Sequence, residues 1–207
     1  MADLSPLIFI VDDDASVREA VSNLLESVGF RTQVFQSTEQ FQSAARPDVP
    51  SCLVLDVRLP GVSGLQFQEM LAKAGISIPI IFITAHGDVP MTSRAMKGGA
   101  IDFLMKPFQK EDLLAAIHQG LERDRRRREE QAEWSLLQSR FDELTAREGE
   151  VLELVGAGLT NKEAAAKLGI SEVTIKMHRG QVMRKMKAAS LAELVRMVDR
   201  LKPRARQ

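Results

Sequence analysis

Three apolar runs of strand length limit what the first half of the chain can fold into. Each run is apolar throughout instead of alternating with polar residues, which is typical of strands covered on both faces of a parallel sheet. Two further runs are weaker strand candidates. The strong runs are Leu7–Val11, Cys52–Leu55 and Pro79–Ile83, and the weaker ones are Arg31–Phe35 and Ile101–Met105.

Helical patterns separate these runs. Between Val17 and Val28, apolar residues recur at helical spacing, and Gly29 can end that helix. The segments Leu65–Leu71 and Asp112–Leu121 are further helix candidates. Five strands alternating with five helices predict an α/β domain with a doubly wound, five-stranded parallel sheet.

Chemically distinctive polar residues stand at the carboxyl ends of four expected strands. Such sheets bind their ligands beyond this edge, so we expect these side chains to meet there. Asp12, Asp13 and Asp14 follow the first strand, Asp56 ends the third, Thr84 ends the fourth and Lys106 follows the fifth.

This set of side chains suits the transfer of a phosphoryl group to an aspartate. Carboxylates from two strand ends can hold Mg²⁺, which takes oxygen ligands and keeps several waters. Mg²⁺ and a lysine can neutralise the charge that develops on the phosphoryl oxygens, while a hydroxyl donates a hydrogen bond. Each residue alone is commonly a helix cap or a loop residue, and only the combination indicates this chemistry.

Residues 123–142 predict a helical linker. The run Arg123–Glu130 is almost entirely charged, and the apolar residues Trp134, Leu137, Phe141 and Leu144 follow at 3–4–3 spacing. This apolar stripe either docks on its own domain or forms a short dimer seam, since fewer than three heptads do not establish a coiled coil. The arginines at 125–128 either touch DNA or belong to a solvated helix face.

The last part of the chain predicts an all-α domain with a helix-turn-helix. Thr145 and Glu148 have capping-box spacing, as do Thr160 and Glu163, and each pair precedes a helix. A short helix, a turn at Leu168–Ile170 and a long helix rich in Lys and Arg form the motif. Ser171 is expected to cap the long helix, which runs to about Met186, and Ser190 caps the last one.

The two parts of the chain differ in charge. Residues 1–121 hold 9 Lys and Arg against 14 Asp and Glu, a net −5, whereas residues 122–207 hold 19 against 14, a net +5. A basic part can contact nucleic-acid phosphates, although a solvated basic surface would have the same composition.

Membrane spans, secretion signals and paired cysteines are the sequence features that indicate where a protein is located. No apolar run approaches the roughly 18 residues of a membrane span, and no secretion signal is recognisable. The single cysteine, Cys52, lies in an apolar run as a core thiol would, which excludes a disulfide framework. We therefore expect a cytoplasmic protein with no membrane partner.

Four motifs at the expected strand ends resemble the CheY-like receiver domain of bacterial response regulators. The resemblance covers about residues 5–122, and it implies that Asp56 is phosphorylated by a sensor histidine kinase. The motifs are Ile8–Asp14, Leu55–Gly61, Ile83–Gly87 and Lys106–Phe108.

The same resemblance implies roles for the surrounding residues. Mg²⁺, or another divalent metal, is expected to be bound by Asp12, Asp13, Asp56 and the backbone carbonyl of Arg58. Asp14 would be an acidic residue of the first helical turn and not a ligand.

Further roles concern switching and phosphate binding. Thr84 and Phe103 would be the switch pair, although Phe103 also fits a permanently buried core position. Lys106 would pair with the phosphoryl group, and the Lys106–Pro107 bond is expected to be cis. His86 is expected to line the site as a loop residue rather than to act as a base.

The C-terminal part resembles the four-helix module of the LuxR and NarL class of regulators, and the chain as a whole is most similar to the FixJ subfamily. The matching segments are Leu144–Glu148, Gly158–Ala165, Leu168–Ser171 and Val173–Arg179. Members often carry a longer polar residue where Gly180 stands, which weakens a direct base contact at that position.

The second helix of a helix-turn-helix enters the major groove with its N-terminal part. Four residues are therefore expected to face DNA, namely Thr174, Lys176, Met177 and Gly180, and Lys176 either reads guanine edges or binds phosphate. Phosphate contacts are expected from Arg179, Arg184 and Lys185, and contacts near the backbone at the start of the scaffold helix from Asn161 and Lys162. The core is expected to contain Ile175, Val182 and Met186.

We therefore predict a receiver domain over 1–122, a helical linker over 123–142 and a LuxR-type DNA-binding domain over 143–207. Phosphorylation of Asp56 would control homodimerisation and sequence-specific binding to promoter DNA, and so regulate, most simply activate, transcription by RNA polymerase. A phosphatase with an aspartate nucleophile is disfavoured, because it would carry a second acid where Arg58 stands, so no enzyme is expected. A DNA-binding protein that ignores phosphate is disfavoured by the intact acidic set.

Overall fold

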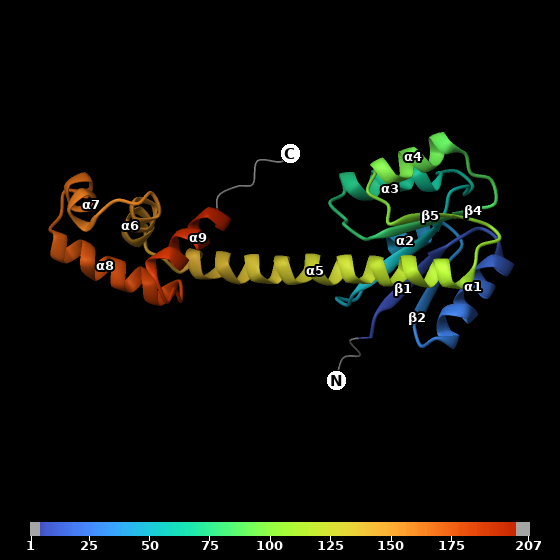
Figure 1. Ribbon diagram of the computed structural model, residues 1–207, viewed down its shortest axis with the longest axis horizontal. Helices are drawn as coiled ribbons and strands as arrows, with labels where there is room; N and C mark the ends of the chain where they lie inside the picture. Colours follow the sequence, from blue (N-terminus) through green and yellow to red (C-terminus); the bar gives the residue numbers. More distant parts are fainter. Residues whose placement is uncertain (1–4, 202–207) are drawn as a thin grey trace. The chain divides into compact units, whose positions relative to one another are not determined.

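The computed structural model describes residues 5–201 of the chain, which divide into two compact units at residues 128 and 129. The predicted outer boundaries at residues 1 and 207 lie outside the described residues. The helix α5, Lys110–Asp142, runs through the division between the units without interruption (Figure 1). The two units are described separately below. No helix within residues 5–201 combines the length and the apolar character needed to cross a membrane.

The first unit contains the predicted five-stranded parallel sheet, with strand order β2-β1-β3-β4-β5. β1 and β2 have the predicted bounds. β3 is longer than predicted by one residue at each end, and β4 is shifted by one residue so that it includes Thr84. β5 begins one residue later than predicted. The strands are β1 (Leu7–Val11), β2 (Arg31–Phe35), β3 (Ser51–Asp56), β4 (Ile80–Thr84) and β5 (Asp102–Met105).

Helices cover both faces of this sheet, which is why the central strands are apolar throughout. On one face Phe9 and Phe82 pack with residues of α2, α3 and α4, and on the other face Ile8 and Ile81 pack with α1 and α5. Cys52 lies in the second of these layers, where burial raises the pKa of its thiol, as expected for a core cysteine. The covering helices are α1 (Ala15–Ser27), α2 (Thr38–Ser43), α3 (Gly64–Lys73), α4 (Val89–Lys97) and the first part of α5.

Side-chain caps start these helices close to the strand ends. The side chain of Asp14 accepts a hydrogen bond from the backbone N–H of Ser16, so Asp14 is the N-cap of α1. The prediction that it lies in the first helical turn was therefore wrong by one position. Ser63 starts α3 with a capping box that includes Gln66. These caps fix where the chain leaves the carboxyl edge of the sheet.

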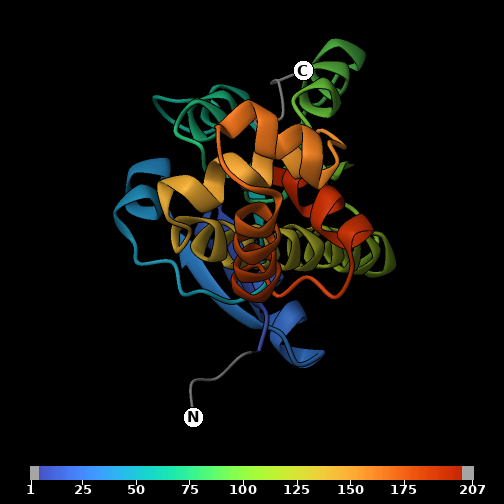
Figure 2. The same ribbon diagram turned by 90° about the vertical axis from the view of Figure 1, so that its left-hand side faces the viewer.

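The second unit is helical and contains the predicted helix-turn-helix (Figure 1 and Figure 2). Both predicted capping boxes are present, Thr145 with Glu148 and Thr160 with Glu163, and Gly169 adopts a left-handed conformation in the turn. Ile175, Val182 and Met186 are buried in the core of this unit, as predicted. Its helices are α6 (Ala146–Gly156), α7 (Asn161–Leu168), α8 (Glu172–Lys185) and α9 (Leu191–Leu201).

The apolar stripe of the linker is used mainly inside the second unit. Leu137 is buried in the core of that unit, and Phe141 and Leu144 pack against it. Trp134 stays exposed. Leu137, Phe141 and Leu144 therefore dock on their own domain, which was one of the two alternatives for this stripe; the other was a dimer seam.

Candidate functional site

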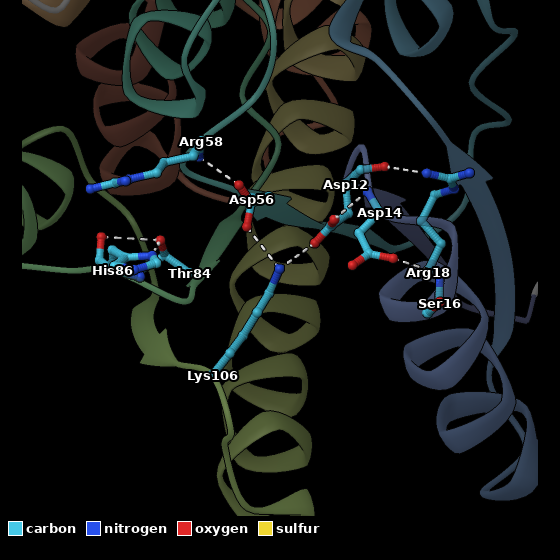
Figure 3. A network of polar contacts seen from close by, with 9 residues as sticks. All are labelled: Asp12, Asp14, Ser16, Arg18, Asp56, Arg58, Thr84, His86 and Lys106. Carbon is cyan, nitrogen blue, oxygen red and sulfur yellow. Dashed lines mark hydrogen bonds and ion pairs between the residues drawn. The ribbon is translucent and has the colours of Figure 1, made fainter.

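Three charged side chains meet at the carboxyl edge of the sheet, from the ends of β1, β3 and β5 (Figure 3). The Nζ of Lys106 lies 2.5 Å from Oδ2 of Asp12 and 2.8 Å from Oδ1 of Asp56. Asp12 is 1% exposed and Asp56 is 5% exposed, so both carboxylates are held inside the edge and not on the open surface. The sheet topology explains the meeting, because β1 and β3 are hydrogen-bonded neighbours and Lys106 reaches back to them.

Each carboxylate is also fixed by backbone groups. Asp56 accepts a hydrogen bond of 2.5 Å at Oδ2 from the backbone N–H of Arg58, so both of its oxygens have donors. Asp12 accepts a hydrogen bond at Oδ1 from the backbone N–H of Asp14, and its backbone carbonyl accepts one from Arg18. Both oxygens of each carboxylate therefore have a hydrogen-bond donor.

Burial and charge pairing oppose each other at this site. Burial raises the pKa of the Asp56 carboxyl above its ordinary value, and the hydrogen bond from Lys106 offsets part of that rise. Burial alone would lower the pKa of Lys106, but its hydrogen bonds to Asp12 and Asp56 outweigh this effect and raise it. Lys106 therefore stays protonated, and the carboxylate of Asp56 binds a proton more readily than that of an ordinary aspartate.

The fold brings only some of the predicted metal ligands close to one another. Among residues 5–201, no three His, Cys, Asp or Glu side chains form a group that could hold a metal ion. Asp13 is exposed, whereas its neighbour Asp12 is buried. Asp12 and Asp56 nevertheless share one cation, the Lys106 ammonium, so two hard oxygen ligands already converge on a positive charge. This donor set fits Mg²⁺, which is commonly bound by one or two carboxylates together with water.

Thr84 is the last residue of β4 but does not touch Asp56 in the described contacts. Its side chain is fully buried, and its Oγ1 donates to the carbonyl of His86 and accepts from the N–H of the same residue, both at 3.3 Å. His86 itself is exposed at the rim, where it was expected. The threonine thus holds the loop that follows β4.

Phe103 packs against the same loop. Its ring lies 6.2 Å from that of Phe82, and it is partly buried, between the inward and outward positions that the sequence left open. A Cβ added to Gly87 would lie 2.7 Å from Cε1 of Phe103 and 2.6 Å from Sδ of Met105. Both members of the predicted switch pair therefore contact the segment His86–Gly87.

Two glycines of the site were not singled out from the sequence. Gly87 is one, and Gly64 is the other, since a Cβ there would lie 2.3 Å from the backbone carbonyl oxygen of Asp56. Gly64 directly follows the N-cap Ser63, and its N–H donates to the carbonyl of Val57. The only signal in the sequence was a glycine directly after the potential helix cap Ser63, which does not reveal the approach to Asp56. The Lys106–Pro107 bond is cis, as predicted.

The candidate DNA-binding residues divide into exposed and internally paired groups. Lys162, Lys176, Met177, Gly180 and Arg184 are exposed, and Thr174, Asn161, Arg179 and Lys185 are partly buried. Arg179 donates to Oδ1 of Asn161 at 3.0 Å, which joins the recognition helix α8 to the start of α7. Arg184 donates to the side chain of Gln181.

Lys185 is occupied within the second unit. Its Nζ lies 2.6 Å from Oε2 of Glu148 and 3.1 Å from the backbone carbonyl oxygen of Glu143. The same Glu148 closes the capping box of α6 with Thr145. The hydrogen bond from Lys185 lowers the pKa of Glu148, so the Glu148 carboxyl is ionised at neutral pH. This arrangement favours a structural role for Lys185 over the phosphate contact that the sequence suggested.

Comparison with known proteins gives a match for each unit. Residues 8–118 match the family model of the response regulator receiver domain, and residues 142–198 match that of bacterial regulatory proteins of the luxR family. The chain is 53% identical to Nodulation protein W of Bradyrhizobium diazoefficiens, over 97% of this chain and 88% of that protein. It is 46% identical to response regulator protein TmoT of Ectopseudomonas mendocina, over 98% and 92%. A low-resolution structure of response regulator StyR aligns with 94% of this chain and 98% of its own, at 50% identity and a TM-score of 0.84.

Proposed function

This chain belongs to the response regulators that join a receiver domain to a LuxR-type DNA-binding domain, and we propose that phosphorylation of Asp56 controls its binding to DNA. Proteins of this family are transcriptional regulators. The observation that carries the proposal is the position of the Asp56 carboxylate, which is buried at the sheet edge between the ammonium of Lys106 and the N–H of Arg58.

The chemistry of the acceptor follows from this arrangement. An oxygen of Asp56 attacks the phosphorus of a phosphohistidine on a sensor kinase, and the bond from phosphorus to the imidazole nitrogen breaks. The imidazole leaves with the electron pair of that bond and takes up a proton. The phosphoryl group carries a charge of about −1.5 to −2, but the Asp56 carboxylate gives up its own negative charge on forming the acyl phosphate, so the net change is about −1 at most. The Lys106 ammonium, 2.8 Å from Oδ1 of Asp56, partly neutralises this charge.

Asp12, Asp13 and Asp56, with the carbonyl of Arg58, are the residues that would hold Mg²⁺. When bound, the ion supplies positive charge to the phosphoryl oxygens during transfer. Lys106 releases its contact with Asp12 in this arrangement and moves to the phosphoryl group. The fit is supported by the two carboxylates that already share one cation.

Phosphorylation is transmitted through the loop that follows β4. The hydroxyl of Thr84 exchanges its contacts with His86 for an oxygen of the phosphoryl group. Because Phe103 packs against Gly87 in the same loop, movement of the loop frees space into which its ring can turn. The surface formed by α4 and β5 then changes, and two phosphorylated chains pair.

The paired chains bring two helix-turn-helix modules to a two-fold related site in promoter DNA, where transcription by RNA polymerase is regulated. The protein acts in the cytoplasm, where its kinase, its DNA site and the polymerase are all accessible. A phosphatase activity of its own is not part of the proposal, because position 58, where such an enzyme would carry a second acid, holds an arginine with an exposed side chain.

A gel-shift titration tests this function. The full chain with Mg²⁺ is treated with a small-molecule phosphodonor, and its affinity for promoter DNA is expected to rise at least several-fold. Asp56→Asn is expected to lose the donor response but keep the basal affinity, whereas the matched control Asp112→Asn, on the exposed first turn of α5, responds like the wild type. A full donor response in Asp56→Asn would remove Asp56 from the mechanism.

A further inference from the structure

The recognition helix α8 carries exposed apolar side chains on the face opposite to its core contacts. Val173 is 79% exposed and Met177 is 56% exposed. Ile175 and Val182 face the core of the unit and are fully buried. With about 100° of rotation per residue, positions 173, 177, 180 and 184 fall within roughly 40° of the direction opposite to these core residues.

The face continues with a glycine that packing does not require. A Cβ at Gly180 would have no atom within 4 Å, so no neighbour excludes a side chain there. Glycine inside a helix costs about 0.5–1 kcal/mol relative to alanine. Its absent side chain instead leaves the helix backbone open to close approach by a partner.

The N-terminal part of this face, formed by Val173, Met177 and Gly180, therefore has no side chain that hydrogen-bonds. The exposed Arg184 continues the face toward the C-terminus and the exposed Lys176 lies beside it, so positive charge borders the apolar part. Single exposed apolar residues are common on protein surfaces and need no explanation. Two of them lie on successive turns of the helix that a helix-turn-helix places in the major groove, and they suit a partner with apolar groups and surrounding negative charge.

The major groove of DNA has such apolar groups at thymine, whose C5-methyl projects into the groove. We propose that Val173 and Met177 read thymine through this methyl group, and that Gly180 lets α8 come close enough for the contact. The inference rests on the proposed DNA-binding function and specifies how that function selects its sequence. Lys176 and Arg184 then hold the phosphates on either side of the apolar contact.

Duplex DNA fits this face better than the other candidate partners. The major groove of A-form RNA is deep and narrow, so a helix with these side chains does not reach its bases. Two apolar side chains are also far too small an area for a stable protein interface. The flanking positive charge agrees with a phosphate-lined groove.

Replacement of thymine by deoxyuridine tests the inference, because it removes only the methyl group. Sites are first selected from random duplexes with the phosphodonor-treated full chain, and each thymine is then replaced in turn. The wild type is expected to lose affinity about fourfold at one or two thymines of each half-site, the loss expected for one buried methyl group. The remaining replacements should have little effect.

Matched variants assign the contacts. Val173→Ala and Met177→Ala, both at exposed positions, should each abolish the uracil penalty at one thymine, and the double variant at both. Lys176→Ala is the control, which should weaken binding to every duplex but keep the penalty. Helical circular dichroism confirms that each variant is folded.

The experiment distinguishes failure of the DNA-binding function from failure of the thymine-reading inference. If the wild type selects no sequence at all, the DNA-binding function itself is wrong, and the inference falls with it. If selective binding is found but uracil is tolerated at every position, or the penalty persists in the double variant, only the thymine-reading inference is overturned.

Discussion

The buried carboxylate of Asp124 accepts a hydrogen bond of 3.0 Å from the backbone N–H of Ser51. Ser51 begins β3, the strand whose other end carries Asp56. Asp124 is 1% exposed and also binds the guanidinium groups of Arg127 and Arg128, each with a contact of 2.7 Å. Asp124, with Arg127 and Arg128, therefore anchors α5 on the receiver sheet. Arg125 and Arg126 of the same cluster are exposed, as on a solvated helix face.

Replacing Asp124 should loosen this anchor. Asp124→Ala leaves the Ser51 N–H and Arg127 without their acceptor, while Arg128 keeps its ion pair with Asp48. We expect a loss of about 2 kcal/mol, below the range for fully buried pairs because both arginines are partly exposed. Urea unfolding of the full chain followed by circular dichroism measures it. Asp112→Ala, on the exposed first turn of the same helix, should change the stability little. Equal effects of the two substitutions would show that Asp124 is not an anchor.

The raised pKa of Asp56 makes the stability of the receiver dependent on pH. Because the folded pKa lies above the unfolded one, the cost of burying the charge is fully present above the folded pKa, and it is relieved as the pH falls through the folded pKa toward the unfolded value. Asp56→Asn removes this cost, so the variant should be more stable than the wild type at neutral pH. The difference should shrink near pH 4, about the ordinary pKa of the group. Thermal unfolding at both pH values measures it, and a variant less stable at neutral pH would contradict the account.

Gly87 should not tolerate a side chain. In Gly87→Ala the new Cβ would lie 2.7 Å from the ring of Phe103, so the loop or the ring must shift, and we expect a destabilisation of about 1–3 kcal/mol. Gly149→Ala is the matched control, since a Cβ there meets nothing within 4 Å in α6 and should be neutral or stabilising. Calorimetry of both variants measures the effects. A neutral Gly87→Ala would mean that Phe103 does not pack tightly against this loop.

Lys185 and Arg184 are adjacent but should behave differently on DNA. Lys185→Ala breaks the ion pair with Glu148 and should destabilise the second unit by about 1 kcal/mol, with little change in the salt dependence of DNA binding. Arg184→Ala should leave the stability unchanged and lower the slope of log affinity against log salt by about 1. Affinity measured at several salt concentrations separates the two. If Lys185→Ala lowered the slope and Arg184→Ala did not, Lys185 would be the phosphate contact.

The backbone of the receiver was predictable, because its signals are local. The run Leu7–Val11 became a strand with the expected bounds, since burial on both faces leaves a uniform apolar pattern. The weaker candidate Arg31–Phe35, a partly exposed strand, also has the expected bounds. Parallel strand ends must share one edge, which brought Asp12, Asp56 and Lys106 together.

What the sequence did not predict depends on pairings between distant residues. A charged run around Asp124 has the composition of a solvated helix face, and only the fold places Ser51 beside it. Likewise, nothing local to Lys185 shows that Glu148 lies within reach. The close approach of Gly64 to the Asp56 backbone is a property of the α3 start in three dimensions.

The central claim is that Asp56 is the phosphoryl acceptor, and mass spectrometry of the intact chain tests it most directly. After treatment with a small phosphodonor and Mg²⁺, the wild type should gain the mass of one phosphoryl group, and fragmentation should locate it on Asp56. The gain should be absent from Asp56→Asn and present in Asp13→Asn to a lesser extent, since that residue would act only through the metal. A phosphoryl group located on another residue of the wild type, or an undiminished gain in Asp56→Asn, would contradict the account.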